Sequence, residues 1–235
     1  MKNARPVAIA FFEEGALPDV DEFVSRHDMT WEDEEAPKIV QKQGDSALLD
    51  VNGQSFTFAS FSKPLEWSTL EGPCSTAWWW ENAEDELRSH DSHLVLMPVE
   101  DPFDPVDTAL VLTRLAATLC KFKNCSGVLW PTGTVVHPPD GFFQQAKKAS
   151  IDFLPLLLWV DFRIAPDERG RFYLFTTGLD TFGKHEIEVL PSQHPPQIVI
   201  ERAFDIAHYV LASDVKLSDG ETVGTSHDER IPVKL

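Results

Sequence analysis

The sequence predicts an α+β fold made of two ferredoxin-like (split βαβ) halves, whose mainly antiparallel sheets pack into one body. Short apolar runs with period-two alternation are interspersed with segments that carry helix-start signals. The order strand, helix, strands, helix, strand occurs once in residues 1–103 and again in residues 104–235. No low-complexity linker separates the two ranges, so we expect one body with two lobes.

Four signals place the elements of the first half. Residues 7–12 form a short apolar run, which predicts a buried strand, and Asp19 marks the start of a helix. Asn52-Gly53 stands between two alternating runs, which is the strongest hairpin signal in the chain. A helix is predicted over residues 73–88, because it opens with a proline, and an apolar strand follows at residues 93–99.

The second half begins with a long helix, for which Asp104 is the expected N-cap and Pro105 the first-turn residue. Residues 106–122 are apolar on nearly every side, so this helix should be buried on more than one face. Pro195-Pro196 opens the last long helix. Between the helices, period-two alternation predicts an antiparallel meander of three strands, at residues 158–164, 171–177 and 185–190.

Composition favours a protein partner over a nucleic acid or a membrane. The chain has 38 Asp and Glu against 20 Lys and Arg, which gives a formal charge of -18. Nucleic acids and anionic membranes are polyanions and would be repelled, whereas a basic protein would be attracted. The three cysteines are sparse and unpaired in spacing, and no apolar run is long enough for a signal peptide or a membrane span. We therefore expect a cytoplasmic protein, either a monomer or a homodimer.

The run Trp78, Trp79 and Trp80 is the most unusual feature of the sequence. Three consecutive helical residues sweep about 200°, which is wider than the core stripe of a surface helix. At least one of these indoles should therefore face something other than the local core. It either fills a contact between the two lobes or anchors another protein, because Trp is enriched at binding hot spots.

A second candidate site lies on the polar face of the predicted meander. Asp161, Glu186 and Glu188 share that face, and His185 is the first residue of the last predicted strand. The face is either a solvated sheet surface or the carboxylate-lined site of a hydrolase.

The remaining His and Cys residues form no specific motif. His90, Asp91 and His93 lie in one loop, which is weak support for a metal site. Cys120 and Cys125 are five residues apart, which is not a usual zinc spacing, and no spacing pairs either with His137. We expect buried free thiols. Phosphate-binding glycine loops are absent, so no cofactor and no metal are predicted.

Two stretches resemble a known bacterial family. They are GVLWPTGTVVHPPDGF (residues 127–142) and TTGLDTFGKHEIEV (residues 176–189). Both are similar to the family catalogued as domain of unknown function 4261, and the likeness covers roughly the second half of the chain. The resemblance implies no established activity and supplies no catalytic residues.

The sequence thus favours a non-enzymatic protein-binding module, an inhibitor or immunity-like partner of a basic protein. The alternative is a hydrolase that uses the carboxylates and His of the polar sheet face. A flat acidic surface with an exposed Trp would favour the binder, and a cleft in which Asp161, His185, Glu186 and Glu188 converge would favour the enzyme.

Overall fold

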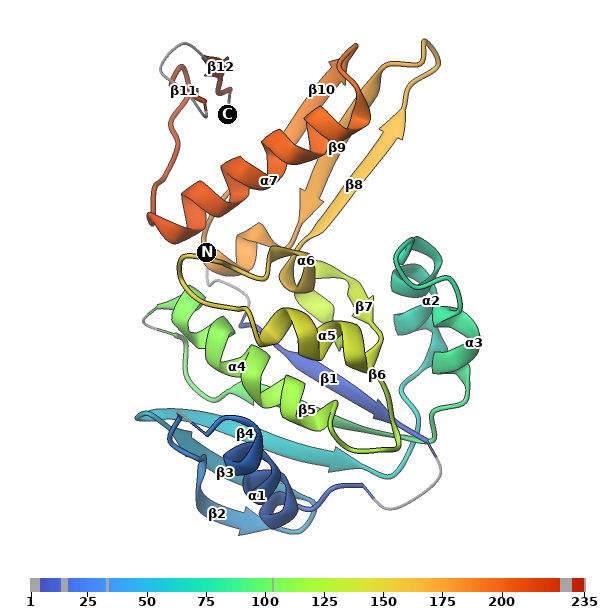
Figure 1. The fold of residues 1–235 in the computed structure, drawn as a ribbon, viewed down its shortest axis with the longest axis vertical. Coiled ribbons are helices and arrows are strands. Elements are labelled where there is room, and N and C mark those ends of the chain that lie inside the picture. Colours follow the sequence, from blue (N-terminus) through green and yellow to red (C-terminus); the bar gives the residue numbers. More distant parts are fainter. Residues whose placement is uncertain (1–4, 14–16, 33, 103, 225–229, 235) are drawn as a thin grey trace.

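A seven-stranded and a three-stranded sheet, both antiparallel, organise the chain (Figure 1). The computed structural model spans residues 1–235 and describes residues 5–13, 17–32, 34–102, 104–224 and 230–234. The large sheet has the order β2-β3-β4-β5-β1-β6-β7. Its strands are β1 Ala8–Phe12, β2 Lys38–Gln43, β3 Ser46–Val51, β4 Gln54–Phe61, β5 Ser92–Pro98, β6 Cys125–Trp130 and β7 Val135–His137. The α+β class predicted from the sequence is confirmed.

Helices cover both faces of the large sheet. On one face, Ala10 and Phe12 of β1 belong to a core shared with α1 (Val20–Thr30), α4 (Pro105–Leu119) and α5 (Pro139–Ala146). On the other face, Ile9 and Phe11 belong to a second core shared with α2 (Trp67–Thr76) and α3 (Ala83–Arg88). Every residue of β1 is consequently buried, as a central strand between two helical layers requires.

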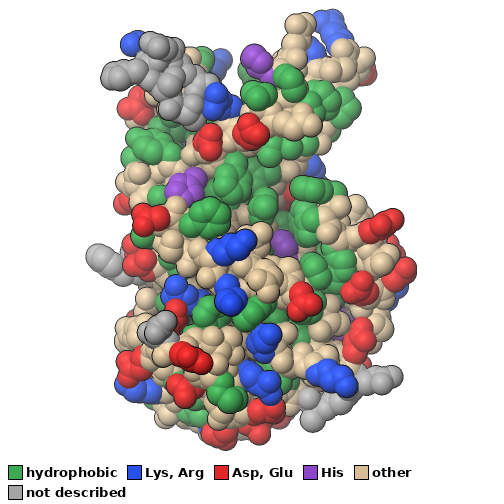
Figure 2. Space-filling view, in the orientation of Figure 1, with side chains coloured by type: hydrophobic (Ala, Val, Ile, Leu, Met, Phe, Trp, Pro, Cys, Tyr) green, Lys and Arg blue, Asp and Glu red, His purple; other side chains and the backbone are tan. Residues whose placement is uncertain are grey.

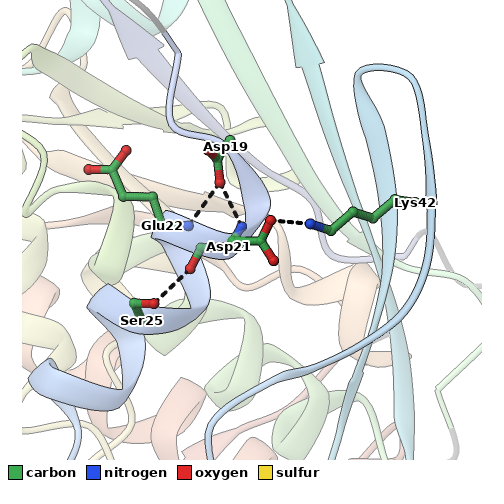
Figure 3. A network of polar contacts seen from close by, with 5 residues as sticks. All are labelled: Asp19, Asp21, Glu22, Ser25 and Lys42. Carbon is green, nitrogen blue, oxygen red and sulfur yellow. Dashed lines mark hydrogen bonds and ion pairs between the residues drawn. The ribbon is translucent and has the colours of Figure 1, made fainter.

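A polar network fixes α1 against the edge of this sheet (Figure 3). Asp19 is the N-cap, and its carboxylate accepts hydrogen bonds from the backbone N–H groups of Asp21 at 2.8 Å and Glu22 at 2.9 Å. These bonds satisfy two of the orphan donors of the first helical turn. Lys42 of the edge strand β2 pairs with the Asp21 carboxylate, which joins the helix to the strand.

The long helix α4 is buried on more than one face, as predicted. Asp104 caps it through the N–H groups of Val106 and Asp107, at 2.9 and 3.1 Å. Its buried Thr113 accepts a hydrogen bond from the Trp159 indole at 2.8 Å, which gives both of these buried polar groups a partner. Within the described part of the chain, neither α4 nor any other helix is both long and apolar enough to cross a membrane.

The smaller sheet is the predicted meander, and it is covered on one face. It consists of β8 Asp161–Pro166, β9 Phe172–Thr177 and β10 Glu188–Ser192, in the order β10-β9-β8. The helix α7 (Pro196–Ala212) packs on one face, where the Phe204 ring lies 5.5 Å from that of Phe162. Arg163, Phe175 and Glu188 are partners across the strands on the opposite face.

The first strand of the meander begins later than predicted. Residues 156–159 form a short helix, α6 (Leu156–Trp159), and the Val160 N–H donates to the Leu156 carbonyl at 2.8 Å. Leu158 and Trp159 are both buried, so both sides of this segment face the core. A continuous apolar run of this kind does not distinguish a strand from a buried helical turn.

The prediction of two matching ferredoxin-like halves, which rests on the element order, is wrong. The strand β1 pairs with β5 on one side and with β6 on the other, so strands from both sides of residue 104 share one sheet. The next largest sheet has three strands, and its strand order does not correspond to that of the large sheet. Element order does not determine which strands pair. Here β1 is central and pairs with one strand from each part of the chain.

The prediction of a single helix over residues 73–88 is also wrong. Pro73 lies inside α2, and α2 and α3 are separated by a turn that contains the Trp run. The Ala77 N–H bonds to the Cys74 carbonyl and the Trp80 N–H to the Ala77 carbonyl, which tightens the chain into successive turns. The Trp side chains are therefore presented by a turn rather than by a helix.

Candidate functional site

The turn between α2 and α3 sends its three indoles into different surroundings. The Trp78 side chain is 79% exposed, Trp79 is half-buried, and Trp80 is only 7% exposed. Trp80 packs in the core beneath α2 and α3, against Gly127 of β6. A Cβ atom at residue 127 would come within 2.8 Å of the Trp80 ring, so only glycine leaves room for this indole. One Trp therefore holds the turn to the sheet, and another is left in solvent.

Trp79 forms the support on which Trp78 rests. Its indole N–H donates to the Val136 carbonyl at 2.9 Å, and its ring stacks on His137 with centroids 5.4 Å apart and planes 17° from parallel. The Trp78 ring meets Trp79 edge-on, at 5.5 Å and 82°. Edge-to-face pairs of this kind are favourable beyond their buried area. The exposed indole thus stands on neighbours with fixed positions.

His137 completes the support as an uncharged ring. Burial lowers the pKa of His137 to about 3, and its Nε2 atom has no hydrogen-bond partner among the described residues. The ring is accordingly neutral at pH 7 and contributes a flat stacking surface rather than a charge. The backbone of Leu157 lies beside it, and the Leu157 side chain is 43% exposed.

The surroundings of the Trp run are acidic. Residues 66–91 contain seven Asp and Glu and a single basic residue, Arg88. The Arg88 guanidinium is already engaged, because it pairs with Glu84 at 2.6 Å and lies over the Trp67 ring at 4.0 Å. Figure 2 shows Asp and Glu side chains in red over the part of the surface that α2 and α3 form. The exposed Trp78 indole therefore lies in a negatively charged part of the surface.

The carboxylates of the small sheet are occupied by structural contacts. Glu186 accepts hydrogen bonds from the Gly178 N–H at 2.8 Å, the Asp180 N–H at 3.2 Å and the Thr176 hydroxyl at 2.6 Å. These bonds cap the 3₁₀ helix Leu179–Phe182. Asp161 is ion-paired with Arg163 at 2.5 Å, and burial raises the pKa of the Asp161 carboxyl.

The four residues of the predicted hydrolase site are not joined to one another. Among the described residues, no hydrogen bond or ion pair links any two of Asp161, His185, Glu186 and Glu188. His185 and Glu188 are exposed, whereas Asp161 is buried beside the sheet. Glu186 is the first residue of the Glu-x-Glu motif at residues 186–188, and its capping hydrogen bonds give this part of the motif a structural role.

The other sequence candidates also have structural roles. His90 accepts a hydrogen bond from the Leu65 N–H at 2.8 Å through Nε2, and its Nδ1 contacts the Leu87 carbonyl. His93 contacts the Lys63 carbonyl through Nδ1 at 2.9 Å. Both rings thus hold the chain that leads into α2. In the ranges that the structure describes, no three His, Cys, Asp or Glu side chains are grouped to hold a metal ion.

The prediction of buried free thiols is confirmed. Cys74, Cys120 and Cys125 are all free and buried. Burial raises the pKa of the Cys74 thiol to about 11 and places that of Cys120 well above its usual value. Thiols of this kind are poor nucleophiles at neutral pH, because the thiolate is the reactive form.

A cleft beside α7 was not anticipated from the sequence. Its lining includes Arg202, Tyr209, Lys216 and Arg230. The only sequence signal for it is a set of basic residues in the last third of an acidic chain, and no motif connects them.

One comparison with known proteins gives a match. Residues 175–235 match the model of the family described as "Domain of unknown function (DUF4261)". This confirms the resemblance predicted from residues 176–189, whereas residues 127–142 lie outside the matched range. Neither the comparison with curated proteins nor that with solved structures gives a match. The matched range contains the end of β9, all of β10 and α7 and the chain that follows them, but not the Trp run.

Proposed function

We propose that this protein is a non-enzymatic binding module that engages a basic protein, as an inhibitor or an immunity-like partner does, with Trp78 as its anchor. The observation that carries the proposal is the 79% exposure of Trp78 on a turn whose other two indoles are fixed. Large aromatic groups are rarely left in solvent, and Trp is the residue most enriched at interface hot spots. A cytoplasmic location, in keeping with the three free cysteines, is part of the proposal.

Pre-organisation supports the role of Trp78 as an anchor. A flexible side chain loses rotamer freedom when a partner orders it, and this loss weakens binding. Trp78 already packs edge-on against Trp79, which the Val136 carbonyl and the His137 ring hold in place. The indole therefore presents its surface with little further ordering.

Charge supports a basic partner in particular. The exposed residues Glu71, Glu81, Asp85 and Glu86 lie on α2, on α3 and in the turn between them, and no ion pair holds them among the described residues. A rim of free carboxylates around an apolar anchor attracts Lys- and Arg-rich surfaces and repels acidic ones. The overall charge of -18 extends the same preference to longer range.

No observation favours the alternative, a hydrolase built on Asp161, His185, Glu186 and Glu188. A general acid or base needs a free proton-accepting or proton-donating atom near the substrate. The carboxylate oxygens of Glu186 accept three hydrogen bonds, and Asp161 is ion-paired with Arg163. The contacts of these carboxylates account for the geometry of the turn and the sheet without any catalytic role.

The proposal is tested by crosslinking from position 78. Trp78 is replaced by p-benzoylphenylalanine, the protein is irradiated in lysate of the source cells, and crosslinked proteins are identified by mass spectrometry. The matched control carries the same group at Met29, which is 65% exposed on α1. We expect a basic protein to be captured from position 78 and not from position 29. Capture of the same proteins from both positions, or of acidic proteins from position 78, would contradict the proposal.

A further inference from the structure

A cleft of about 810 Å³ lies between α7 and the chain that follows it. After α7 the chain turns back and runs beside the helix toward the hairpin of β11 (Thr222–Val223) and β12 (Ile231–Pro232) (Figure 1). Ile206 and Tyr209 of α7 line one wall, and Val215, Leu217 and Ile231 line the other. The volume is in the range of small-molecule sites, and the walls combine apolar and polar surface. The whole lining falls within the residues that match the family model.

The lining of the cleft has more basic than acidic side chains, namely Arg202, Lys216 and Arg230 against Asp205 and Glu221. Asp205 is ion-paired with Arg202 at 3.7 Å, and the Glu221 carboxylate accepts a hydrogen bond from the Ser218 N–H at 2.7 Å. The N–H partner of Glu221 is uncharged, so the lining keeps an excess of one positive charge. Within the described residues, no hydrogen bond or ion pair engages the Lys216 ammonium or the Arg230 guanidinium, and both side chains are exposed.

Two cations without partners are unexpected in this chain, which has nearly twice as many acidic as basic residues. Asp214, two residues before Lys216, is bound by Lys184 at 2.6 Å, and its charge also interacts with that of Lys216. Figure 2 shows Lys and Arg side chains in blue beside the C-terminal hairpin, near α7. The cleft thus combines an apolar wall, an aromatic ring and cationic groups that are available to a ligand.

We propose that this cleft binds a small anion with an aromatic or apolar body, such as an aromatic phosphate or carboxylate. Lys216 and Arg230 hold the anionic group, because charge-assisted hydrogen bonds to ammonium and guanidinium groups are the strong ones. Tyr209, which is 48% exposed, and Ile206 take the apolar body. The site is separate from the Trp78 turn and does not depend on the proposed function.

The charge of the whole protein restricts the ligand to a small one. A polyanion such as a nucleic acid would bring many charges close to a chain with a net charge of -18. A ligand with one or two charges experiences mainly the local field of the cleft, because charges beyond about 10 Å are screened at 0.1 M salt. The cleft therefore selects small anions over nucleic acids.

Fluorine NMR of 3-fluorotyrosine-labelled protein tests this proposal directly. The chain contains two tyrosines, Tyr209 in the cleft and Tyr173 in β9, so the spectrum has one reporter and one internal control. A Tyr173→Phe variant assigns the two signals. The protein is titrated with phenyl phosphate, with benzyl alcohol as the uncharged analogue and with inorganic phosphate as the anion without an apolar body.

We expect phenyl phosphate to shift the Tyr209 signal saturably and to leave the Tyr173 signal in place, while both control compounds bind at least about tenfold more weakly. The double variant Lys216→Gln/Arg230→Gln should weaken phenyl phosphate binding by about tenfold or more, since it removes two charge-assisted contacts. Asp205→Asn should strengthen binding, because it removes a negative charge from the lining of the cleft.

Lys148→Gln, a change of an exposed lysine on the large-sheet side of the molecule, is the control variant and should bind like the wild type. The proposal is overturned if the Tyr209 signal does not respond at millimolar phenyl phosphate, or if both tyrosines respond alike. It is equally overturned if benzyl alcohol or inorganic phosphate binds as tightly as phenyl phosphate. Wild-type affinity in the Lys216/Arg230 double variant would show that these two side chains do not bind the anion, and would also overturn the proposal.

Discussion

The seven-stranded and the three-stranded sheet differ in how completely they are covered. In the large sheet, helices pack on both faces, and Phe11 and Phe12 of β1 are each 0% exposed although they point in opposite directions. In the small sheet, Phe162 and Leu174 are buried toward α7, whereas Phe175 on the other face is 36% exposed. The large sheet therefore supplies most of the core, and the small sheet supplies surface.

This difference separates the two candidate sites by the rigidity of their supports. The Trp78 turn rests on the doubly covered sheet, through Trp80 in its core and Trp79 on β7. The cleft rests on α7, a single helix over a single sheet face, and its second wall is the chain after the helix. We interpret the first as a fixed anchor and the second as an adaptable pocket. The following experiments are designed to break or sharpen this comparison.

Truncating one aromatic ring in each sheet should give the largest contrast. Phe11→Ala removes a fully buried ring between two layers and should cost about 3–5 kcal/mol of unfolding free energy, because it leaves a cavity. Phe175→Ala removes a ring that is partly in solvent and should cost less than about 1 kcal/mol. Urea unfolding of both variants measures the difference. Equal costs would mean that the two sheets are covered alike.

Gly133, at the junction of the two regions, should not tolerate a side chain. A Cβ at Gly133 would lie 2.1 Å from the Trp159 carbonyl oxygen, which is backbone and has little freedom to move. Gly133→Ala should therefore cost about 3 kcal/mol, as overpacking does. Gly170→Ala is the control, since it has a positive φ of 72° but no atom within 4 Å, and it should cost only about 1 kcal/mol. Similar values for both would show that the close approach at residue 133 relaxes freely.

Acid should weaken the large-sheet region through two buried histidines. Burial lowers the pKa of His27 to about 4 and that of His137 to about 3. Since the folded-state pKa values lie below the unfolded value of about 6.5, the unfolded chain takes up protons first as the pH falls. The stabilisation is complete above pH 6.5 and is lost as the pH falls from there toward 4 for His27 and toward 3 for His137.

Each histidine should contribute about 1.4 kcal/mol per pH unit within its window. We expect the free energy of unfolding of His137→Gln to fall less steeply between about pH 6 and pH 4.5 than that of the wild type. At pH 7 to 8 the slopes of the two proteins should agree, which serves as the control. An unchanged slope below pH 6 would show that His137 is protonated in the folded protein.

Removing the Glu186 cap should have a smaller effect, confined to the small-sheet region. Glu186→Gln weakens three hydrogen bonds to Thr176, Gly178 and Asp180 and should cost about 1–2 kcal/mol. Glu188→Gln changes an exposed carboxylate on the same strand end and should cost less than about 0.5 kcal/mol. Hydrogen exchange at residues 178–182 reports the loss locally. Equal exchange in both variants would contradict the capping role.

Local signals in the sequence were sufficient for several elements. Asn52 and Gly53 have positive φ angles of 53° and 80° and close the β3–β4 hairpin, as the dipeptide predicts. The N-cap of α4 and the proline start of α7 were likewise predicted, because capping depends on residues adjacent in sequence. The antiparallel order of the meander followed from short connections.

Long-range pairing was not predictable from the same signals. Nothing in residues 8–12 shows that β1 pairs with both β5 and β6, since an apolar strand suits any central position. The edge strand β2 was missed because it is almost entirely exposed and so lacks an apolar face. In the candidate site, the sequence indicates the Trp run but predicts a helix there, because a proline is typical of a helix start, whereas Pro73 lies inside α2.

The most direct test of the central proposal is the kinetics of binding to the partner captured from position 78. Association and dissociation rates are measured at several salt concentrations for the wild type, for Trp78→Ala and for Leu190→Ala, which removes a 72% exposed side chain from the small sheet. We predict association rates that fall steeply with salt in all three proteins, and dissociation about 30-fold faster in Trp78→Ala alone, which corresponds to about 2 kcal/mol. Association that ignores salt, together with wild-type dissociation of Trp78→Ala, would contradict the account.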